Sequence, residues 1–225
     1  MTTKTLALDG PAGSGKSSVS RAVAKQLDWV MLDTGAMYRA ITWSVLNANI
    51  ELSDSAAVAR HALGTTIEIT TNPQEFRISA NGHDVTSTIR SQEVTDAVSE
   101  VSAVPEVREL LVSLQRKAVE DSDFGIVIEG RDIGTVVLPD SALKVFLTAS
   151  PQARATRRSR EINPDADQAQ IARTRESIEI RDTKDSGREY SPLKPALDAQ
   201  ILDTSDLTLE AVVEQLVDLV RNTYT

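Results

Sequence analysis

The sequence has 225 residues, a formal net charge of −9 and no cysteine. Binding of duplex nucleic acid needs a strongly positive surface, which this charge does not imply, and the lack of cysteine excludes disulfides and thiolate metal sites. No apolar run is long enough to span a bilayer, and the first predicted strand leaves no room for a signal peptide. We therefore expect a globular protein of the reducing cytoplasm, without nucleic-acid or membrane partners.

The first predicted elements are a strand, a glycine-rich loop and a helix. Residues 5–8 form an apolar run typical of a buried strand, and residues 18–27 place apolar side chains on one helical stripe. Between them, Gly10-Pro11-Ala12-Gly13-Ser14-Gly15-Lys16-Ser17 matches the Walker A pattern at every fixed position. Such a loop binds phosphates, because glycines allow close approach and N–H groups at the helix start face the anion.

The rest of the chain alternates strands with helices. A strand over residues 29–32 precedes a helix over 36–48, and residues 63–85 then resemble a small antiparallel insert around the hairpin signal Asn81-Gly82. We predict further strands over 124–128, 143–147 and 200–203, and helices over 105–120, 151–161, 167–185 and 208–220. This pattern predicts an α/β fold: a five-stranded, mostly parallel sheet with helices on both faces, the insert and a helical, arginine-rich lid.

Ligands of such sheets bind at the carboxyl ends of the strands. We expect Lys16 to reach the β- and γ-phosphates of a nucleotide and the Ser17 hydroxyl to ligate Mg²⁺. Arg39 lies one turn into the helix after the second strand, where it can hold a phosphate bidentately. After the next core strand, Glu129 is expected to orient Mg²⁺ through water, and Arg131 to point toward a transferred phosphoryl group.

Structural alternatives to these roles stay open. Arg39 could be a surface residue, Arg131 could pair with Glu129 or Asp132, and about half of the arginines from 154 to 188 should be structural. The two histidines, His61 and His83, are expected to be exposed bystanders. No candidate general base stands out, which favours an acceptor that is already anionic, such as a phosphate oxygen.

Five segments resemble bacterial cytidylate kinases in order and spacing over essentially the whole chain. They are Gly-Pro-Ala-Gly-Ser-Gly-Lys-Ser, Leu-Asp-Thr-Gly-Ala-Met-Tyr-Arg, Ile-Arg-Ser-Gln-Glu-Val, Glu-Gly-Arg-Asp-Ile-Gly-Thr-Val-Val-Leu-Pro-Asp and Glu-Ile-Arg-Asp-Thr-Lys-Asp-Ser-Gly-Arg. Related nucleoside monophosphate kinases share the first segment but lack the insert and the Gly-Arg-Asp stretch. The resemblance implies a monomeric enzyme that, with Mg²⁺, converts ATP and CMP or dCMP to ADP and CDP or dCDP.

The resemblance also assigns residues. It implies that the cytosine lies among Ser99, Arg108, Asp132 and Arg188, the sugar near Thr34, Asp185 and Arg181, and the phosphates near Arg39, Arg131, Arg181 and Arg188. Thr34 stands where some relatives have serine, and the hydroxyl is kept. In all, we expect catalytic roles for Lys16, Arg131, Arg181 and Arg188, metal binding by Ser17 and Glu129, and ATP binding by Gly10, Pro11, Ala12, Gly13, Ser14, Gly15, Lys16, Ser17, Ser18 and Arg157.

The predicted organisation is one kinase domain over residues 1–225. Its core comprises residues 1–35, 95–155 and 190–225, its acceptor-binding region residues 36–94 with the insert at about 63–86, and its lid residues 156–188. Two alternatives remain: a P-loop kinase for another small acceptor, such as UMP, AMP or a metabolite hydroxyl, and a nucleotide-binding switch or scaffold. Against the switch, the guanine-reading motif Asn-Lys-x-Asp does not occur in the sequence.

Overall fold

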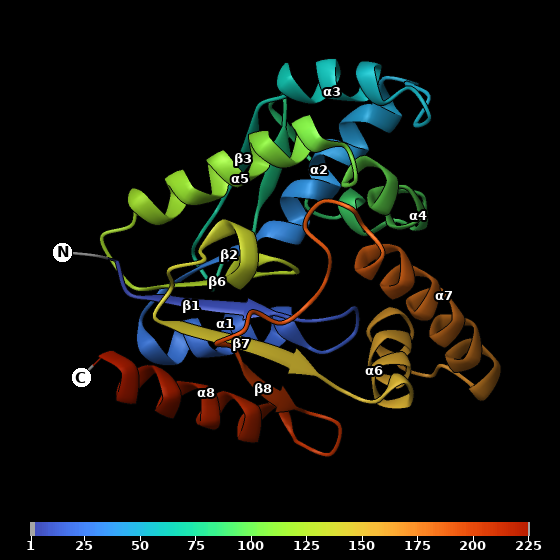
Figure 1. Ribbon diagram of the computed structural model, residues 1–225. Helices are drawn as coiled ribbons and strands as arrows, with labels where there is room; N and C mark the ends of the chain where they lie inside the picture. The colour runs from blue at the N-terminus through green and yellow to red at the C-terminus, as the bar shows by residue number, and fades with distance from the viewer. Residues whose placement is uncertain (1–2, 225) are drawn as a thin grey trace.

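A five-stranded parallel sheet forms the centre of the computed structural model, which describes residues 3–224 (Figure 1). The strand order is β2-β6-β1-β7-β8, and every neighbouring pair is parallel. The prediction of a mostly parallel sheet is therefore confirmed. The strands are β1 (Thr5–Asp9), β2 (Val30–Asp33), β6 (Ile126–Gly130), β7 (Leu143–Thr148) and β8 (Gln200–Asp203).

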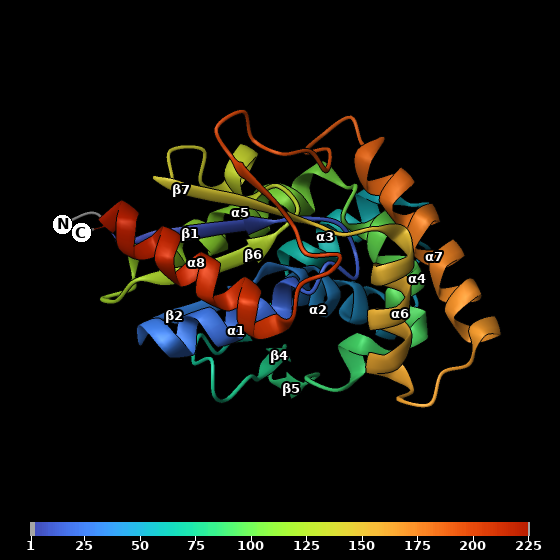
Figure 2. The same cartoon turned by 90° about the horizontal axis from the view of Figure 1, so that it is seen from below.

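Helices cover both faces of the sheet (Figures 1 and 2). Helices α1 (Lys16–Leu27) and α8 (Leu209–Tyr224) pack on one face, where they bury Leu6 and Leu8 of β1. The other face buries Ala7 beneath α2 (Thr34–Asn47), α3 (Ser55–Leu63) and α5 (Pro105–Glu120). Because alternate residues of a strand face opposite sides, the middle of a strand covered on both sides must be apolar, as Leu6, Ala7 and Leu8 of β1 are.

The predicted antiparallel insert is confirmed as a three-stranded sheet of β3 (Ile67–Ile69), β4 (Ile78–Ala80) and β5 (His83–Asp84). Its hairpin turn contains Asn81 and Gly82, which both have positive φ, at 50° and 76°. A two-residue turn with both φ values positive matches the right-handed twist of the strands, and asparagine and glycine adopt it most readily. Ile78 and Ala80 then pack the insert against Ala36 and Ala40 of α2.

Several expected boundaries and one side-chain environment differ from the prediction. Helices α3 and α4 (Gln92–Val101) were not predicted, and α1 and α2 each begin two residues earlier than expected. The earlier start of α2 follows from its cap, because the Asp33 carboxylate accepts the N–H of Ala36 at 2.9 Å. His61 is not an exposed bystander: it is half-buried, with Nε2 2.8 Å from Ser44 Oγ, because α3 packs against α2. His83 is exposed, as predicted.

Two helices, α6 (Pro151–Ile162) and α7 (Gln168–Ser186), lie side by side at the end of the sheet toward which the strands point (Figure 1). Both starts are capped locally. Ser150 Oγ accepts the N–H of Ala153, and Asp167 and Gln170 form a reciprocal capping box. The pair thus has defined starts next to the ligand-binding edge of the sheet. Within residues 3–224, no helix combines the length and apolarity that crossing a membrane requires.

Candidate active site

A cleft of about 950 Å³ opens at the carboxyl end of the sheet. Its wall includes the Walker A loop, the start of α2, the end of β6 and helices α6 and α7. Most residues predicted for the site line this one cleft: Ala12, Gly13, Gly15, Lys16, Ser17, Ser18, Thr34, Arg39, Arg108, Glu129, Arg131, Asp132, Arg181, Asp185 and Arg188. Five predicted residues do not line it: Gly10, Pro11, Ser14, Ser99 and Arg157.

The Walker A loop has the backbone that its glycines predict. Gly15 caps α1 at φ 87°, in the left-handed region that other residues avoid, and nothing lies within 4 Å of where its Cβ would be. At Gly13, a Cβ would approach the Arg154 carbonyl oxygen to 2.8 Å, so close packing of α6 also requires glycine. The Lys16 ammonium lies over the loop and donates to the Pro11 carbonyl at 2.8 Å.

A buried carboxylate faces this ammonium and the first turn of α1. Glu129 is 3% exposed, and its Oε1 has no hydrogen-bond partner. Burial, and next the carboxylate of Asp33, raise the pKa of Glu129 to about 8, although Lys16 and a hydrogen bond with Ser17 act in the opposite direction. Burial, and next Arg131, lower the pKa of Lys16 to about 7. Each charge here therefore needs a further partner.

An unpartnered carboxylate oxygen beside a serine hydroxyl suits a hard cation such as Mg²⁺. No cluster of three or more His, Cys, Asp or Glu side chains among residues 3–224 could hold a metal on its own. Glu129 and Ser17 would therefore hold Mg²⁺ together with phosphate oxygens of a nucleotide and with water, as is usual for this ion. The residues present fit the predicted metal.

The number of protons taken up or released on ligand binding tests the roles predicted for Lys16 and Glu129. We expect ATP binding without metal to take up protons between pH 7 and 8, because phosphates favour the charged ammonium of Lys16, whose pKa is about 7 in the free protein. Addition of Mg²⁺ should then release protons, because the cation favours ionised Glu129, whose pKa is about 8. Calorimetry in two buffers of different ionisation enthalpy measures both the proton uptake and the proton release. Glu129→Gln should abolish only the release, and proton uptake on Mg²⁺ addition would contradict the assignment.

Arginines from three segments converge on the cleft. Arg39 donates to the Ile89 carbonyl at 3.1 Å and to Thr95 Oγ1 at 2.9 Å, so it is not a surface arginine. Arg131 does not pair with Glu129 or Asp132, because its guanidinium turns toward the lid, with Nε 3.3 Å from Asp185 Oδ2. Burial, and next Arg131, lower the pKa of Arg181 to about 9. Crowded, incompletely neutralised guanidinium groups in a cleft favour anionic ligands.

A second cluster in the cleft is formed by Arg108 of α5, Asp132 after β6 and Tyr38 of α2. Arg108 and Asp132 form a buried ion pair at 2.5 Å, and the Arg108 guanidinium also lies 5.2 Å from the centre of the Tyr38 ring. Arg108 donates to the Ser102 carbonyl at 3.0 Å, and Arg188 donates to Ser102 Oγ at 2.8 Å. The cluster thus presents a carboxylate, guanidinium groups, a hydroxyl and an aromatic face, which together can bind a polar planar ring.

Two predicted residues have other partners in the structure. The Ser99 carbonyl accepts from Ser102 Oγ at 3.2 Å, so that Ser102, not Ser99, faces the cleft. Arg157 donates to Thr204 Oγ1 at 2.9 Å, in the turn that follows β8. Two other arginines of α6 have different partners from Arg157. Arg154 donates to the Ala12 carbonyl at 3.0 Å and pairs with the Asp182 carboxylate, whereas Arg158 lines the cleft.

Several cleft residues were not found from the sequence. Ser102 lies in none of the five segments, and Tyr38, Arg90 and Arg158 were not assigned roles. Asp182 lies on α7, where its carboxylate accepts the Ala12 N–H at 3.2 Å and lies 3.6 Å from Arg131. Only its position within the segment Glu179–Arg188, one residue after Arg181, could have drawn attention to it.

Comparison with known proteins places the chain in a family. The family model for cytidylate kinase matches residues 6–222. A cytidylate kinase of Streptomyces avermitilis is 52% identical, with 96% of this chain and 92% of that protein covered. One of Nocardia farcinica is 49% identical, with 94% and 90% covered. Among solved structures, TT1252 from Thermus thermophilus has a TM-score of 0.50 at 16% identity, with both chains fully covered, which supports the fold alone.

Proposed function

The chain belongs to the cytidylate kinase family, and from this premise we propose that it transfers the γ-phosphoryl group of ATP to the phosphate of CMP or dCMP. One observation carries the proposal. A buried Arg108–Asp132 pair suited to a pyrimidine edge lies in the same cleft as a Walker A loop, with arginines between them. The cleft therefore has a place for the donor, a place for the acceptor base, and positive charge where two phosphate chains would meet.

The second cluster, which comprises Tyr38, Ser102, Arg108, Asp132 and Arg188 and is called the base cluster below, complements cytosine better than uracil. Cytosine presents an amine donor beside two acceptors, N3 and O2, which a carboxylate and a guanidinium match. The Asp132 carboxylate would accept from the amine, and Arg108 and Arg188 would donate to the ring acceptors. Uracil would place its O4 lone pairs against the carboxylate, which leaves buried polar groups unpaired and costs about 1–3 kcal/mol.

Replacing this carboxylate should weaken the selectivity. We expect Asp132→Asn to lower the ratio of kcat/KM for CMP over UMP by about ten- to a hundredfold, because the amide can donate to uracil O4. Steady-state assays with both acceptors measure it. Asp121→Asn is the matched control, because Asp121, at the end of α5, also pairs with a basic residue, Lys117, and both side chains are exposed. An unchanged ratio in Asp132→Asn would remove Asp132 from base recognition.

Transfer in this cleft relies on position and charge. Lys16 and the loop N–H groups would hold the donor phosphates, while Arg39, Arg131, Arg181 and Arg188 would hold the acceptor phosphate in line with them. Mg²⁺, held by Ser17 and Glu129, would neutralise charge on the β- and γ-phosphates. Because a phosphate oxygen is already anionic at neutral pH, the reaction needs no general base. Arg157 would lie near the adenine or ribose of ATP, outside the main cleft.

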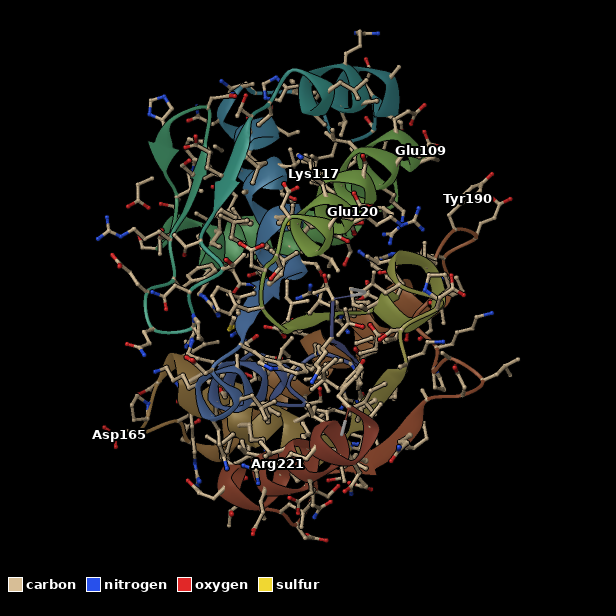
Figure 3. The ribbon with its side chains drawn as sticks, turned by 90° about the vertical axis from the view of Figure 1, so that its left-hand side faces the viewer. Glu109, Lys117, Glu120, Asp165, Tyr190 and Arg221 are labelled. Atoms are coloured by element: carbon tan, nitrogen blue, oxygen red, sulfur yellow. The ribbon has the colours of Figure 1, made fainter. Side chains whose placement is uncertain are left out.

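The proposal extends to the wider setting of the protein. The acceptor-binding region would be residues 36–94 and the lid residues 156–188, both moving against the rigid core. The acidic chain would act as a monomer in the cytoplasm on small molecules of pyrimidine nucleotide metabolism, without nucleic-acid or membrane partners. Exposed acidic side chains such as Glu109 and Glu120 on α5 (Figure 3) lie outside the arginine-rich cleft.

A panel of nucleoside monophosphates tests the function. We expect Mg²⁺- and ATP-dependent ADP release with CMP and dCMP, weak release with UMP, and almost none with AMP or GMP. ATP alone should be hydrolysed slowly, because transfer to water is suppressed while the acceptor is missing. Preference for UMP, AMP or a metabolite hydroxyl would identify a kinase for another acceptor, and tight ATP binding without any turnover would identify a switch.

A further inference from the structure

Asp9 is a buried carboxylate that none of the roles above uses. It is the last residue of β1, directly before the Walker A glycine Gly10, and it is 4% exposed. Its Oδ1 accepts the N–H of Ile133 and its Oδ2 accepts the N–H of Gly134, both at 2.8 Å. Burial raises the pKa of Asp9 to about 6, although these two N–H groups and Lys16 act in the opposite direction. A paired, mostly ionised carboxylate is therefore buried between the donor loop and the segment after β6.

The Asp9 carboxylate binds the backbone after the two-residue segment Arg131-Asp132, and the Asp9 backbone lies beside the residue before that segment in the sheet. In the register of β1 and β6, Asp9 lies opposite Gly130, immediately before Arg131-Asp132. Ile133 and Gly134, which donate to the Asp9 side chain, follow immediately after. Arg131-Asp132 is thus anchored to Asp9 on both sides. Few degrees of freedom remain for the backbone that carries the two side chains.

The two anchored side chains point to the two halves of the cleft. Arg131 lies toward the Walker A loop, with Nη1 3.4 Å from the Gly10 carbonyl, and toward the lid carboxylates. Asp132 lies in the other direction and pairs with Arg108 in the base cluster. One displacement of this backbone would therefore move a phosphate-binding group and a base-binding group together.

Packing around the segment transmits such a displacement. A Cβ at Gly130 would lie 2.6 Å from Ile133 Cδ1 and 2.7 Å from Thr34 Oγ1, so these side chains pack closely around the backbone at Gly130. Asp132 itself has φ −144° and ψ 24°, outside the helix and strand regions, and it precedes the short π-helical turn Ile133–Val137. Without the carboxylate, two buried N–H groups would lack acceptors, and the turn would have to shift to satisfy them.

We propose that Asp9 is a positioning residue, which sets the orientation of Asp132 toward the acceptor base and of Arg131 toward the phosphates. This inference rests on the proposed function, because it concerns how the acceptor of that reaction is read. A carboxylate that served only to stabilise the fold would affect all substrates alike. A positioning residue would affect the acceptor base selectively, and would do so through Asp132.

A double-mutant cycle distinguishes a positioning role of Asp9 from a purely stabilising one. In the full-length protein, kcat/KM for CMP and for UMP is measured in wild type, Asp9→Asn, Asp132→Asn and the double variant. The Asn amide keeps the volume of Asp9 but sets a donor against one of the two N–H groups. We expect Asp9→Asn to lower the CMP/UMP ratio about tenfold, since small misplacements of binding groups have effects of this size or larger, with little change in the KM for ATP. In the Asp132→Asn background, Asp9→Asn should change the ratio hardly at all.

Asp54→Asn removes another carboxylate that accepts a backbone N–H, that of Ala57 at 2.9 Å at the exposed start of α3, and should leave the ratio unchanged. Equal losses for CMP and UMP in Asp9→Asn, or the full ratio change in both backgrounds, would overturn the proposal. If Asp9→Asn does not fold, Asp9→Ser goes through the same cycle, and failure of both to fold would assign Asp9 to folding alone. Wild type inactive on CMP would refute the proposed function, whereas an active wild type with an additive cycle would refute only the role of Asp9.

Discussion

Lys16→Ala is expected to lower kcat by about 10²–10³, the usual effect of removing one group that stabilises transition-state charge, while the KM for CMP stays near its wild-type value. The Lys16 ammonium lies over the Walker A loop, 2.8 Å from the Pro11 carbonyl, whereas the base cluster is built from other elements, with Arg108 on α5 and Asp132 after β6. The substitution therefore removes donor-side charge and leaves acceptor binding intact. Steady-state kinetics with each substrate varied separately, together with direct CMP titration, measures this split.

Lys25→Ala is the matched control for this variant. Lys25 lies on the same helix, in its last turn, and is exposed. We expect its removal to change kcat and both KM values very little. If Lys16→Ala weakened CMP binding as much as it lowered kcat, and also lowered the melting temperature, the loss would reflect unfolding of the loop, and the assigned role of Lys16 would be wrong.

Arg131→Ala is expected to lower kcat by about 10³, within the range for arginines that stabilise the transferred phosphoryl group. Arg131 lies between the Walker A loop and the lid, within 4 Å of the carboxylates of Asp182 and Asp185. Its removal takes away a positive charge and also leaves those carboxylates near the phosphates. Arg131→Lys should recover only part of the rate, because an ammonium lacks the planar fork that binds two oxygens.

A lid arginine outside the cleft controls for this substitution. Arg175 lies on α7, pairs with Glu179 at 2.8 Å, and has a half-exposed side chain. Arg175→Ala should leave kcat close to wild type. Pre-steady-state mixing of both variants with ATP and CMP would separate the chemical step from product release. A full-sized burst in Arg131→Ala at the wild-type rate would show that Arg131 does not act on the transferred group.

The parallel sheet was predictable because each of its buried strands leaves a signal in a short, continuous stretch of sequence. Strands buried on both faces need apolar runs, and Leu6–Leu8 and Val145–Leu147 are such runs. The helix at Pro105–Glu120 was predicted with its observed ends, because proline favours the first turn and a clear apolar stripe follows. Helix α3 was missed because nine alanine- and polar-rich residues give little periodic signal. It forms through packing of Val58 and Ala62 against the core.

Site residues next to strand ends were predictable for the same reason. Parallel strands bring their carboxyl ends to one edge, so Lys16, Glu129 and Arg131 could be placed together from the sequence. Tyr38 and Ser102 could not be placed this way, because they enter the cleft through packing of α2 against α4. Asp9 could not be identified, because it directly follows the predicted strand and its two N–H partners, more than 120 residues away in sequence, give no local signal.

The destination of the γ-phosphoryl group tests the central claim most directly. With Mg²⁺, CMP and ATP labelled in the γ-phosphate, the cleft geometry predicts that the label appears in the β-phosphate of CDP, in one equivalent per ADP formed. Label recovered as inorganic phosphate, or attached to a ribose hydroxyl of CMP, would contradict transfer between two phosphate chains held by one arginine cluster.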